Sequence, residues 1–140
     1  MSTPLSIRFP DLLADRVRAR GVGLGETASG MVVRLVDEGM RMADHPGIVF
    51  RDGPTGRRAG LMNGPDVWEV IVVLCDYAYG RGASPVRSAA KALALTESAV
   101  RTAENYYAAF PDEIDARIAA NAAAADDARR AASTRSRLYQ

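Results

Sequence analysis

One short segment near the amino terminus restricts what this chain can fold into. Leu5-Ser6-Ile7-Arg8-Phe9 alternates apolar and polar side chains with a period of two, which predicts a strand with one buried face. Pro10 stops this strand. No second strand is predicted within residues 1–43, and an isolated strand cannot satisfy its backbone hydrogen bonds. We therefore expect a second copy of the chain to supply the partner strand.

Two helices are predicted after this strand. Asp11 can cap the first helix, and the glycine-rich stretch 21–25 breaks it. Either Thr27 or Ser29 can cap the second helix. The apolar face of this second helix comprises Met31, Val32, Leu35, Val36 and Met40.

This order of strand, proline, helix, glycine turn and capped helix resembles the ribbon-helix-helix family, which includes the Arc, MetJ and CopG repressors. The resemblance covers residues 1–43 and implies a homodimer whose two-stranded antiparallel ribbon lies in the major groove of double-stranded DNA. It places Ser6 and Arg8 toward the base edges and has Thr27 and Ser29 grip a phosphate. The alternative is that Arg8 is only the solvated side of a strand and Ser29 only a helix cap.

Residues 44–110 are predicted to form a winged-helix-like module that starts with a hairpin. Residues 48–51 and 57–61 have the composition of two short strands joined by a turn-rich loop. Asp66 can cap an apolar helix that runs to about Tyr79 and forms the core of this module, with Cys75 as a small buried hydrophobe.

A helix-turn-helix is predicted over residues 86–102. Small Ala89 and Ala90 allow two helices to approach, and Thr96 caps the second helix. Ala94 replaces the usual turn glycine, which costs on the order of 1 kcal/mol when the backbone is left-handed. The alternative is a three-helix packing unit without nucleic acid, because seven basic and seven acidic residues balance in residues 44–110. If this module touches DNA, the candidate contacts are Arg57, Arg58, Ser98, Arg101 and Thr102.

Residues 111–140 are predicted as a helix with little to bury, beginning at Pro111 and ending in a frayed tail over 133–137. The only large apolar residues of this helix, Ile114 and Ile118, lie near its start. An alanine-rich stretch with little surface to bury follows them. Such a segment either becomes ordered on a partner or remains a solvated helix, and we favour the partner. The candidate partner-binding residues are Ile114, Ile118, Arg129, Arg130, Leu138 and Tyr139.

The motifs His45-Pro46-Gly47-Ile48-Val49-Phe50 and Tyr106-Tyr107-Ala108-Ala109-Phe110-Pro111 resemble an actinobacterial VapB-like antitoxin family, whose members append a hairpin and helix-turn-helix to a ribbon-helix-helix. The resemblance implies the antitoxin of a type II toxin-antitoxin pair, which represses its own operon and neutralises a PIN-like nuclease toxin. The alternative is a stand-alone dimeric transcriptional regulator that uses both DNA-binding modules and has no toxin partner. In either case we expect a mainly α fold with a ribbon-helix-helix, a hairpin with helix-turn-helix, and a C-terminal helix.

Composition excludes several other classes. One cysteine and one histidine, Cys75 and His45, provide no zinc ligand set and no Ser-His-Asp triad, so we expect no metal, no cofactor and no enzyme. The apolar run 70–74 is far shorter than the roughly 20 residues that cross a bilayer, and residues 1–4 lack the features of a secretory signal. A cytoplasmic location is therefore expected. Of the 18 basic residues all but Lys91 are arginine, whose guanidinium suits phosphate and guanine.

Overall fold

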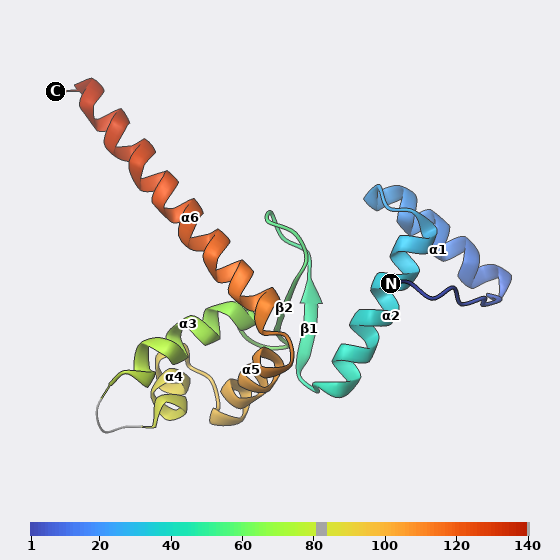
Figure 1. The fold of residues 1–140 in the computed structure, drawn as a ribbon, viewed down its shortest axis with the longest axis horizontal. Helices are drawn as coiled ribbons and strands as arrows, with labels where there is room; N and C mark the ends of the chain where they lie inside the picture. Colours follow the sequence, from blue (N-terminus) through green and yellow to red (C-terminus); the bar gives the residue numbers. More distant parts are fainter. Residues whose placement is uncertain (81–83, 140) are drawn as a thin grey trace. The chain divides into compact units, whose positions relative to one another are not determined.

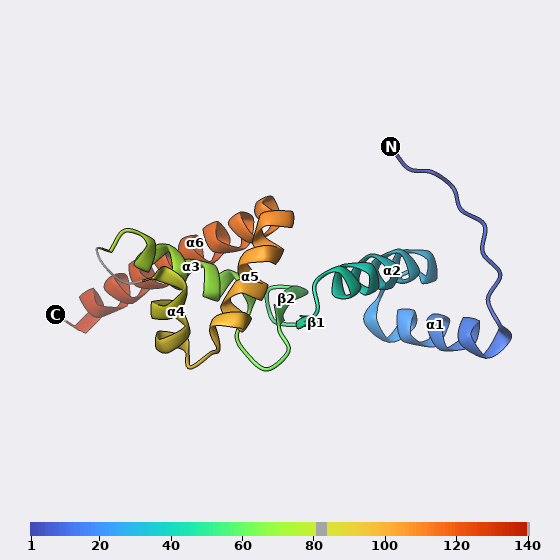
Figure 2. The same ribbon diagram turned by 90° about the horizontal axis from the view of Figure 1, so that it is seen from below.

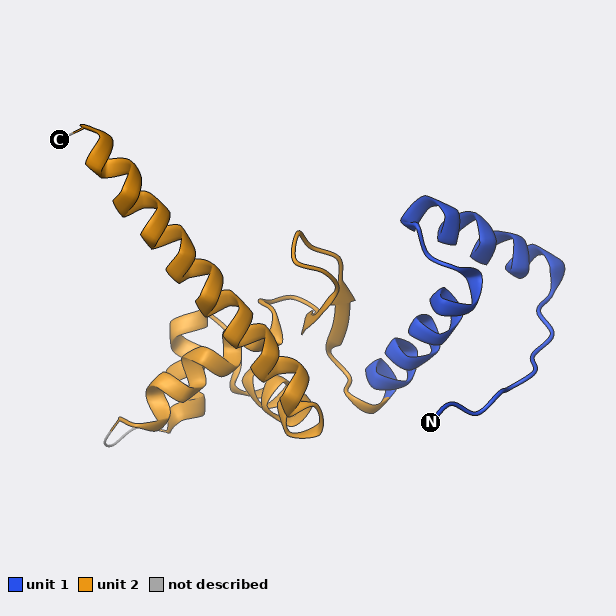
Figure 3. Cartoon of the chain, turned by 45° about the horizontal axis from the view of Figure 1, so that its top comes forward, with its two compact units in different colours: residues 1–43 blue, residues 44–140 orange. Residues whose placement is uncertain are grey.

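The protein is mainly helical. The computed structural model describes residues 1–80 and 84–139, and within them lie six α-helices and one two-stranded antiparallel sheet (Figure 1). This confirms the predicted mainly α class. The chain divides into two compact units, Met1–Ala43 and Asp44–Gln140 (Figure 3).

The first unit holds two helices, α1 (Asp11–Leu24) and α2 (Ala28–Asp44), after residues 1–10 without regular secondary structure. Helix α1 continues through most of the glycine-rich stretch that was predicted to break it. Only Gly25 leaves the helix, with φ 68° and ψ 23°, and its amide bonds to the carbonyls of Gly21 and Val22. Glycine inside a helix costs about 1 kcal/mol without breaking it, so the left-handed residue sets the end.

The second unit begins with the predicted hairpin. Strand β1 (Ile48–Arg51) pairs antiparallel with β2 (Arg58–Leu61), so that Ile48 faces Leu61 and Arg51 faces Arg58. Glycine at position 56 has a φ of 99° in the connecting loop, a value that glycine adopts without steric strain. The turn-rich composition of this loop correctly predicted the reversal.

Four helices and a short 3₁₀ turn complete this unit. They are α3 (Val67–Ala78), α4 (Pro85–Leu93), α5 (Glu97–Ala109), α6 (Pro111–Ser136) and η1 (Arg137–Tyr139). Helix α3 packs against α4, α5 and α6 (Figures 1 and 2). The frayed tail predicted over 133–137 is wrong, because α6 continues to Ser136. Alanine-rich sequence retains helical geometry without tertiary contacts.

The core of this second unit contains side chains from both strands and all four helices. At its centre lies Tyr106, which is fully buried, has ring contacts with His45, Phe50 and Phe110, and donates a hydrogen bond to Glu113 over 3.2 Å. The buried apolar residues are Ile48, Ala59, Leu61, Val67, Val70, Ile71, Val86, Ala89, Ala90, Val100, Ala103, Tyr106 and Ile114.

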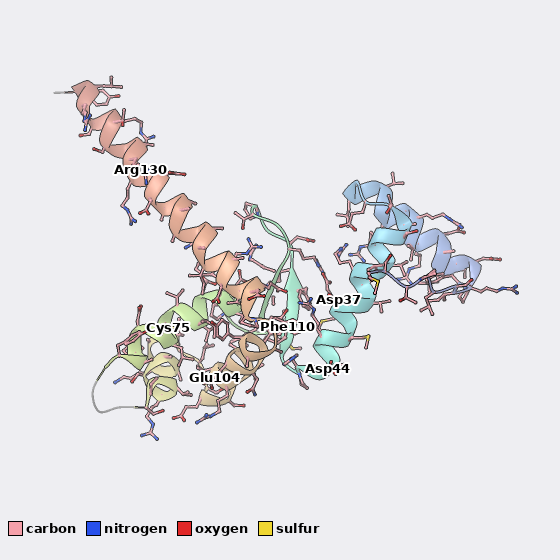
Figure 4. The ribbon with its side chains drawn as sticks, viewed as in Figure 1. Asp37, Asp44, Cys75, Glu104, Phe110 and Arg130 are labelled. Atoms are coloured by element: carbon pink, nitrogen blue, oxygen red, sulfur yellow. The ribbon has the colours of Figure 1, made fainter. Side chains whose placement is uncertain are left out.

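Cys75 does not belong to this core. The thiol side chain is exposed on α3 (Figure 4), so the expected burial is wrong. Residues 75–78 of the same helix are all exposed, whereas Val67, Val70 and Ile71 are buried. The apolar sequence of α3 predicted its helix but not where along its length the packing stops.

No helix in the described ranges 1–80 and 84–139 combines the length and the apolar character needed to span a membrane.

Candidate nucleic-acid interface

The segment predicted as the first strand is unpaired. Residues 5–9 form no strand, because residues 1–43, all of which the structure describes, contain no partner strand. The apolar side chains of this segment remain accessible, with Leu5 81%, Ile7 55% and Phe9 38% exposed. Ser6 and Arg8 are exposed as well, so both have the accessibility that contact with a ligand requires.

The three apolar side chains of this segment border a hollow in the first unit. Leu5, Ile7 and Phe9 line it together with Ala14 and Val17 of α1, and α2 contributes two valines. These three alternate residues therefore lie on the same side of the segment, facing the hollow, because every second side chain of an extended chain points the same way. The valines from α2 are Val32 and Val33.

The first unit buries few apolar side chains. Met31 is the only apolar side chain of the fully described range 1–43 that is buried. Those with more than half of their surface exposed include Leu12, Val22, Leu24, Val33, Val36 and Met40. Large exposed apolar patches are uncommon on the surfaces of soluble monomers, so this set of side chains is a candidate contact surface.

The choice between two caps for α2 is resolved by the hydrogen bonds. The hydroxyl of Thr27 accepts from the amide of Gly30 over 3.0 Å, and the carbonyl of Thr27 accepts from Met31. Ser29 lies inside the first turn with its side chain exposed. Thr27 is therefore the cap, and it lies at the positive end of the helix dipole, where an anion is favoured.

Helices α4 and α5 cover the residues of the second unit where a helix-turn-helix was predicted, and they pack against each other. Between them Ala94 has φ 54° and ψ 42°, and no other non-glycine residue in the described part of the chain has a positive φ. The amide of the next residue, Leu95, bonds back to Ala90 over 2.8 Å. Thr96 caps α5, its hydroxyl accepting from the amide of Ala99 over 3.0 Å.

The residues predicted to contact DNA from α5 lie in different surroundings. Ser98 and Arg101 are exposed. Thr102 is half-buried, its hydroxyl donates to the carbonyl of Ser98 over 3.1 Å, and it lines a pocket within this unit. Glu97, the first residue of α5, forms a 3.1 Å ion pair with Arg87 of α4. The exposed side of α5 thus mixes both signs of charge, as the balanced composition predicted.

The two hairpin arginines, also predicted as DNA contacts, are held by protein groups. The guanidinium of Arg58 pairs with Asp66, a carboxylate only 7% exposed, which Arg51 also approaches at 3.3 Å. Arg57 pairs with Asp52 at 3.1 Å. The strand register places Arg58 beside Asp66, which gives this arginine a structural role.

The ion pairs of Asp66 and the hydrogen bonds of Arg117 were not anticipated. Arg117 donates from α6 to the carbonyl and hydroxyl of Thr55 over 2.8 Å and 2.7 Å, which ties this helix to the hairpin loop. Asp66 was predicted only as a helix cap. Both interactions join residues that the sequence pattern does not relate, so no local motif indicates them.

The residues predicted to bind a protein partner divide along α6. Ile114 is buried in the core and Ile118 packs against it, so a partner role for Ile114 is wrong: its side chain already has neighbours. Arg129 pairs with Asp126, and Arg130 (Figure 4) lies 3.8 Å from Asp127, all on exposed surface. At the end of the chain Leu138 and Tyr139 are 77% and 90% exposed.

Within residues 1–80 and 84–139 no three histidine, cysteine or acidic side chains are grouped as metal ligands.

A hydrogen bond to Asp115 raises the pKa of the Tyr107 hydroxyl, which donates over 3.0 Å. This pair joins α5 to α6 on the surface.

Comparison with known proteins finds no relative: no protein-family model, no curated protein and no solved structure matches the chain.

Proposed function

We propose that this protein is a homodimeric, sequence-specific DNA-binding repressor that acts as the antitoxin of a type II toxin-antitoxin pair. In this proposal residues 1–43 form a ribbon-helix-helix, in which residues 5–9 of two chains pair as an antiparallel ribbon. The repressor regulates its own operon, and the C-terminal helix neutralises a PIN-like nuclease toxin.

One observation carries the DNA-binding part of this proposal. Residues 5–9 alternate in polarity, lie outside any sheet and border an apolar hollow, while nearly every large apolar side chain of residues 1–43 stays accessible. Pairing with a second copy gives this segment its backbone partners and covers those side chains. Ser6 and Arg8 then project from the opposite side of the ribbon, where base edges are read.

The start of α2 supports phosphate binding in the same complex. Thr27 caps this helix and Ser29 lies in its first turn, so hydroxyl and amide donors gather at the positive end of the helix dipole. Backbone contacts of this kind fix the orientation of a protein on DNA without reading sequence.

The far half of α6 supports the antitoxin part. From residue 126 to residue 139 every side chain is exposed, and this stretch includes Arg129, Arg130, Leu138 and Tyr139. A stretch of chain that contributes no buried side chain is available to a partner, and here the resemblance to VapB-like antitoxins supplies the class of partner.

Fluorescence anisotropy on the DNA upstream of the gene tests the repressor proposal. We expect the wild-type protein to bind this DNA far more tightly than a scrambled duplex, with an affinity that falls steeply as salt rises. Arg8→Ala should weaken binding to the upstream DNA at least about tenfold and remove most of the preference over the scrambled duplex.

Arg130→Ala is the matched control, since it removes the same charge from the exposed part of α6. This variant should bind DNA like the wild type. Equal binding by the wild type and Arg8→Ala, or no preference for the upstream DNA, contradicts sequence reading by the ribbon.

A stand-alone regulator is the second candidate, favoured by the helix-turn-helix of α4 and α5 with its capped second helix and exposed Ser98 and Arg101. Sequencing the DNA beside the gene, and coexpression with any small open reading frame found there, distinguish the two. If that frame encodes a toxic nuclease, this chain should restore growth, and a double change of Leu138→Ala and Tyr139→Ala should abolish the rescue while DNA binding persists. Absence of a toxic neighbour favours the stand-alone regulator.

A further inference from the structure

A pocket of about 400 Å³ lies in the second unit at the corner of the helix-turn-helix. One wall is formed by the turn and first half of α5, with Leu95 and Ala99 among its residues. Leu61 at the end of β2 and Met62 in the loop that follows also line the pocket. This volume falls in the range of small-molecule sites, about 300–1,000 Å³.

The walls of this pocket are mainly apolar and rest on the core. Leu61 is buried, and Leu95 and Ala99 pack against the same core cluster, so the floor is already ordered. Among the residues that the structure describes, none that lines the pocket carries a charge. A charged ligand would lose its hydration here without gaining a counter-charge, which disfavours it strongly.

Three polar side chains provide directional contacts at the edge of the apolar surface. The hydroxyl oxygen of Thr96 already accepts from the amide of Ala99, which leaves its proton for a second partner. The hydroxyl of Thr102 donates to the carbonyl of Ser98, which leaves its oxygen able to accept. Asn63 lines the rim with an amide group that does both.

The backbone strain at Ala94 is an independent observation at the same place. This residue has a left-handed conformation at φ 54°, where glycine avoids a steric cost, and it lines the pocket. A strained residue that persists where a relaxed one would fit indicates a role for its side chain. At this position the side chain is the methyl group of a residue that lines the pocket.

We infer that this pocket binds a neutral, mainly apolar small molecule that carries one or two hydrogen-bonding groups. A planar aromatic compound with a single donor meets these requirements. Met62, 61% exposed on the rim, adds an unbranched and polarizable side chain that adapts to the shape of an aromatic ring. This inference does not depend on DNA binding by residues 1–43, so each can fail without the other.

Titration of the isotope-labelled full-length protein with three neutral probes, indole, phenol and benzyl alcohol, tests the inference by NMR. At least one probe should shift the amides of residues 47, 61–63 and 94–102, and the shifts should saturate with a Kd on the order of 1 mM. Indole-3-carboxylate should bind at least about tenfold more weakly than indole, because its charge has no partner in the pocket.

Two variants locate the binding. Ala99→Leu fills the pocket from α5 and should reduce the affinity at least about tenfold, whereas Ala108→Leu, on an exposed position of the same helix, should leave it unchanged. Met62→Glu places a carboxylate on the exposed rim without disturbing the core and should weaken binding about as much.

Three results overturn the inference. They are no saturable shifts with any of the three neutral probes, saturable shifts confined to residues outside the pocket, and binding that persists in both Ala99→Leu and Met62→Glu. Equal affinity for indole and its carboxylate overturns the assignment to a neutral ligand.

Discussion

At the scale of single residues, Ala94 has the backbone conformation that is least favourable for its residue type. Its φ of 54° costs an alanine about 1–2 kcal/mol, while glycine loses about 0.4–1 kcal/mol through its freer unfolded chain. Ala94→Gly should therefore stabilise the second unit by up to about 1 kcal/mol. Urea unfolding followed by the fluorescence of Trp68, the only tryptophan of the chain, measures this change.

Ala92→Gly is the matched control, because Ala92 is exposed inside α4 with ordinary helical geometry. This change should destabilise the unit by about 0.5–1 kcal/mol. If both glycine variants lower the unfolding free energy equally, the left-handed conformation of Ala94 does not destabilise the protein.

The carboxylate of Asp66 is the second residue with a large predicted effect. It is nearly buried, accepts from Arg58 and lies 3.3 Å from Arg51, whose guanidinium also donates to the carbonyls of Leu61 and Gly64. Breaking a fully buried ion pair costs about 3–5 kcal/mol, but both arginines are partly solvated, so Asp66→Asn should cost about 2–3 kcal/mol. Denaturant unfolding with Trp68 fluorescence measures the loss.

Asp52→Asn removes the same charge from the loop of the hairpin. Asp52 pairs with Arg57, but its side chain is 75% exposed, so the change should alter the stability by less than about 1 kcal/mol. Similar losses in both variants would show that burial does not set the strength of these pairs.

At the scale of elements, α6 combines a packed beginning with an exposed remainder. Ile114 is 3% exposed and every residue from 126 to 139 is exposed. Deletion of residues 126–140 should therefore change the unfolding free energy of the second unit by less than about 0.5 kcal/mol, whereas Ile114→Ala should lower it by about 2–4 kcal/mol. A large loss on deletion, seen in the same urea titration, would mean that the far half of α6 stabilises the fold.

Elements whose cause is local were predictable from the sequence. The hairpin followed from its turn residues, α5 from the cap at Thr96, and the left-handed turn from Ala94 in the place of a glycine. Features that depend on residues far apart in the sequence could not be predicted from it. The pairing of Arg58 with Asp66 depends on the strand register, and the exposure of Cys75 depends on where the helices that cover α3 end.

The segment 5–9 belongs to a third kind of case. Its alternation predicts a strand, yet a strand exists only when another strand accepts its hydrogen bonds, and residues 1–43 contain none. The strand at residues 5–9 therefore stays a prediction, which pairing with a partner strand would complete.

At the scale of the whole molecule, the proposed dimer predicts different effects for substitutions at neighbouring residues, because successive side chains of a strand point to opposite sides. If residues 5–9 pair between two chains, Ile7 faces the shared apolar interior and Ser6 faces outward. Ile7→Asp would bury a carboxylate without a partner and should raise the dimer dissociation constant at least about 100-fold. Sedimentation velocity over a concentration series measures this constant.

Ser6→Asp introduces the same charge one residue away, on the side proposed to meet DNA. This variant should remain a dimer at the concentrations where the wild type does, but it should lose affinity for the upstream DNA, because its carboxylate approaches the phosphates. Ile7→Asp should lose both properties, since a monomer has no ribbon. If the two variants change the dimer equally, residues 5–9 do not alternate between an interior and an exterior side, and the ribbon is the wrong account of this segment.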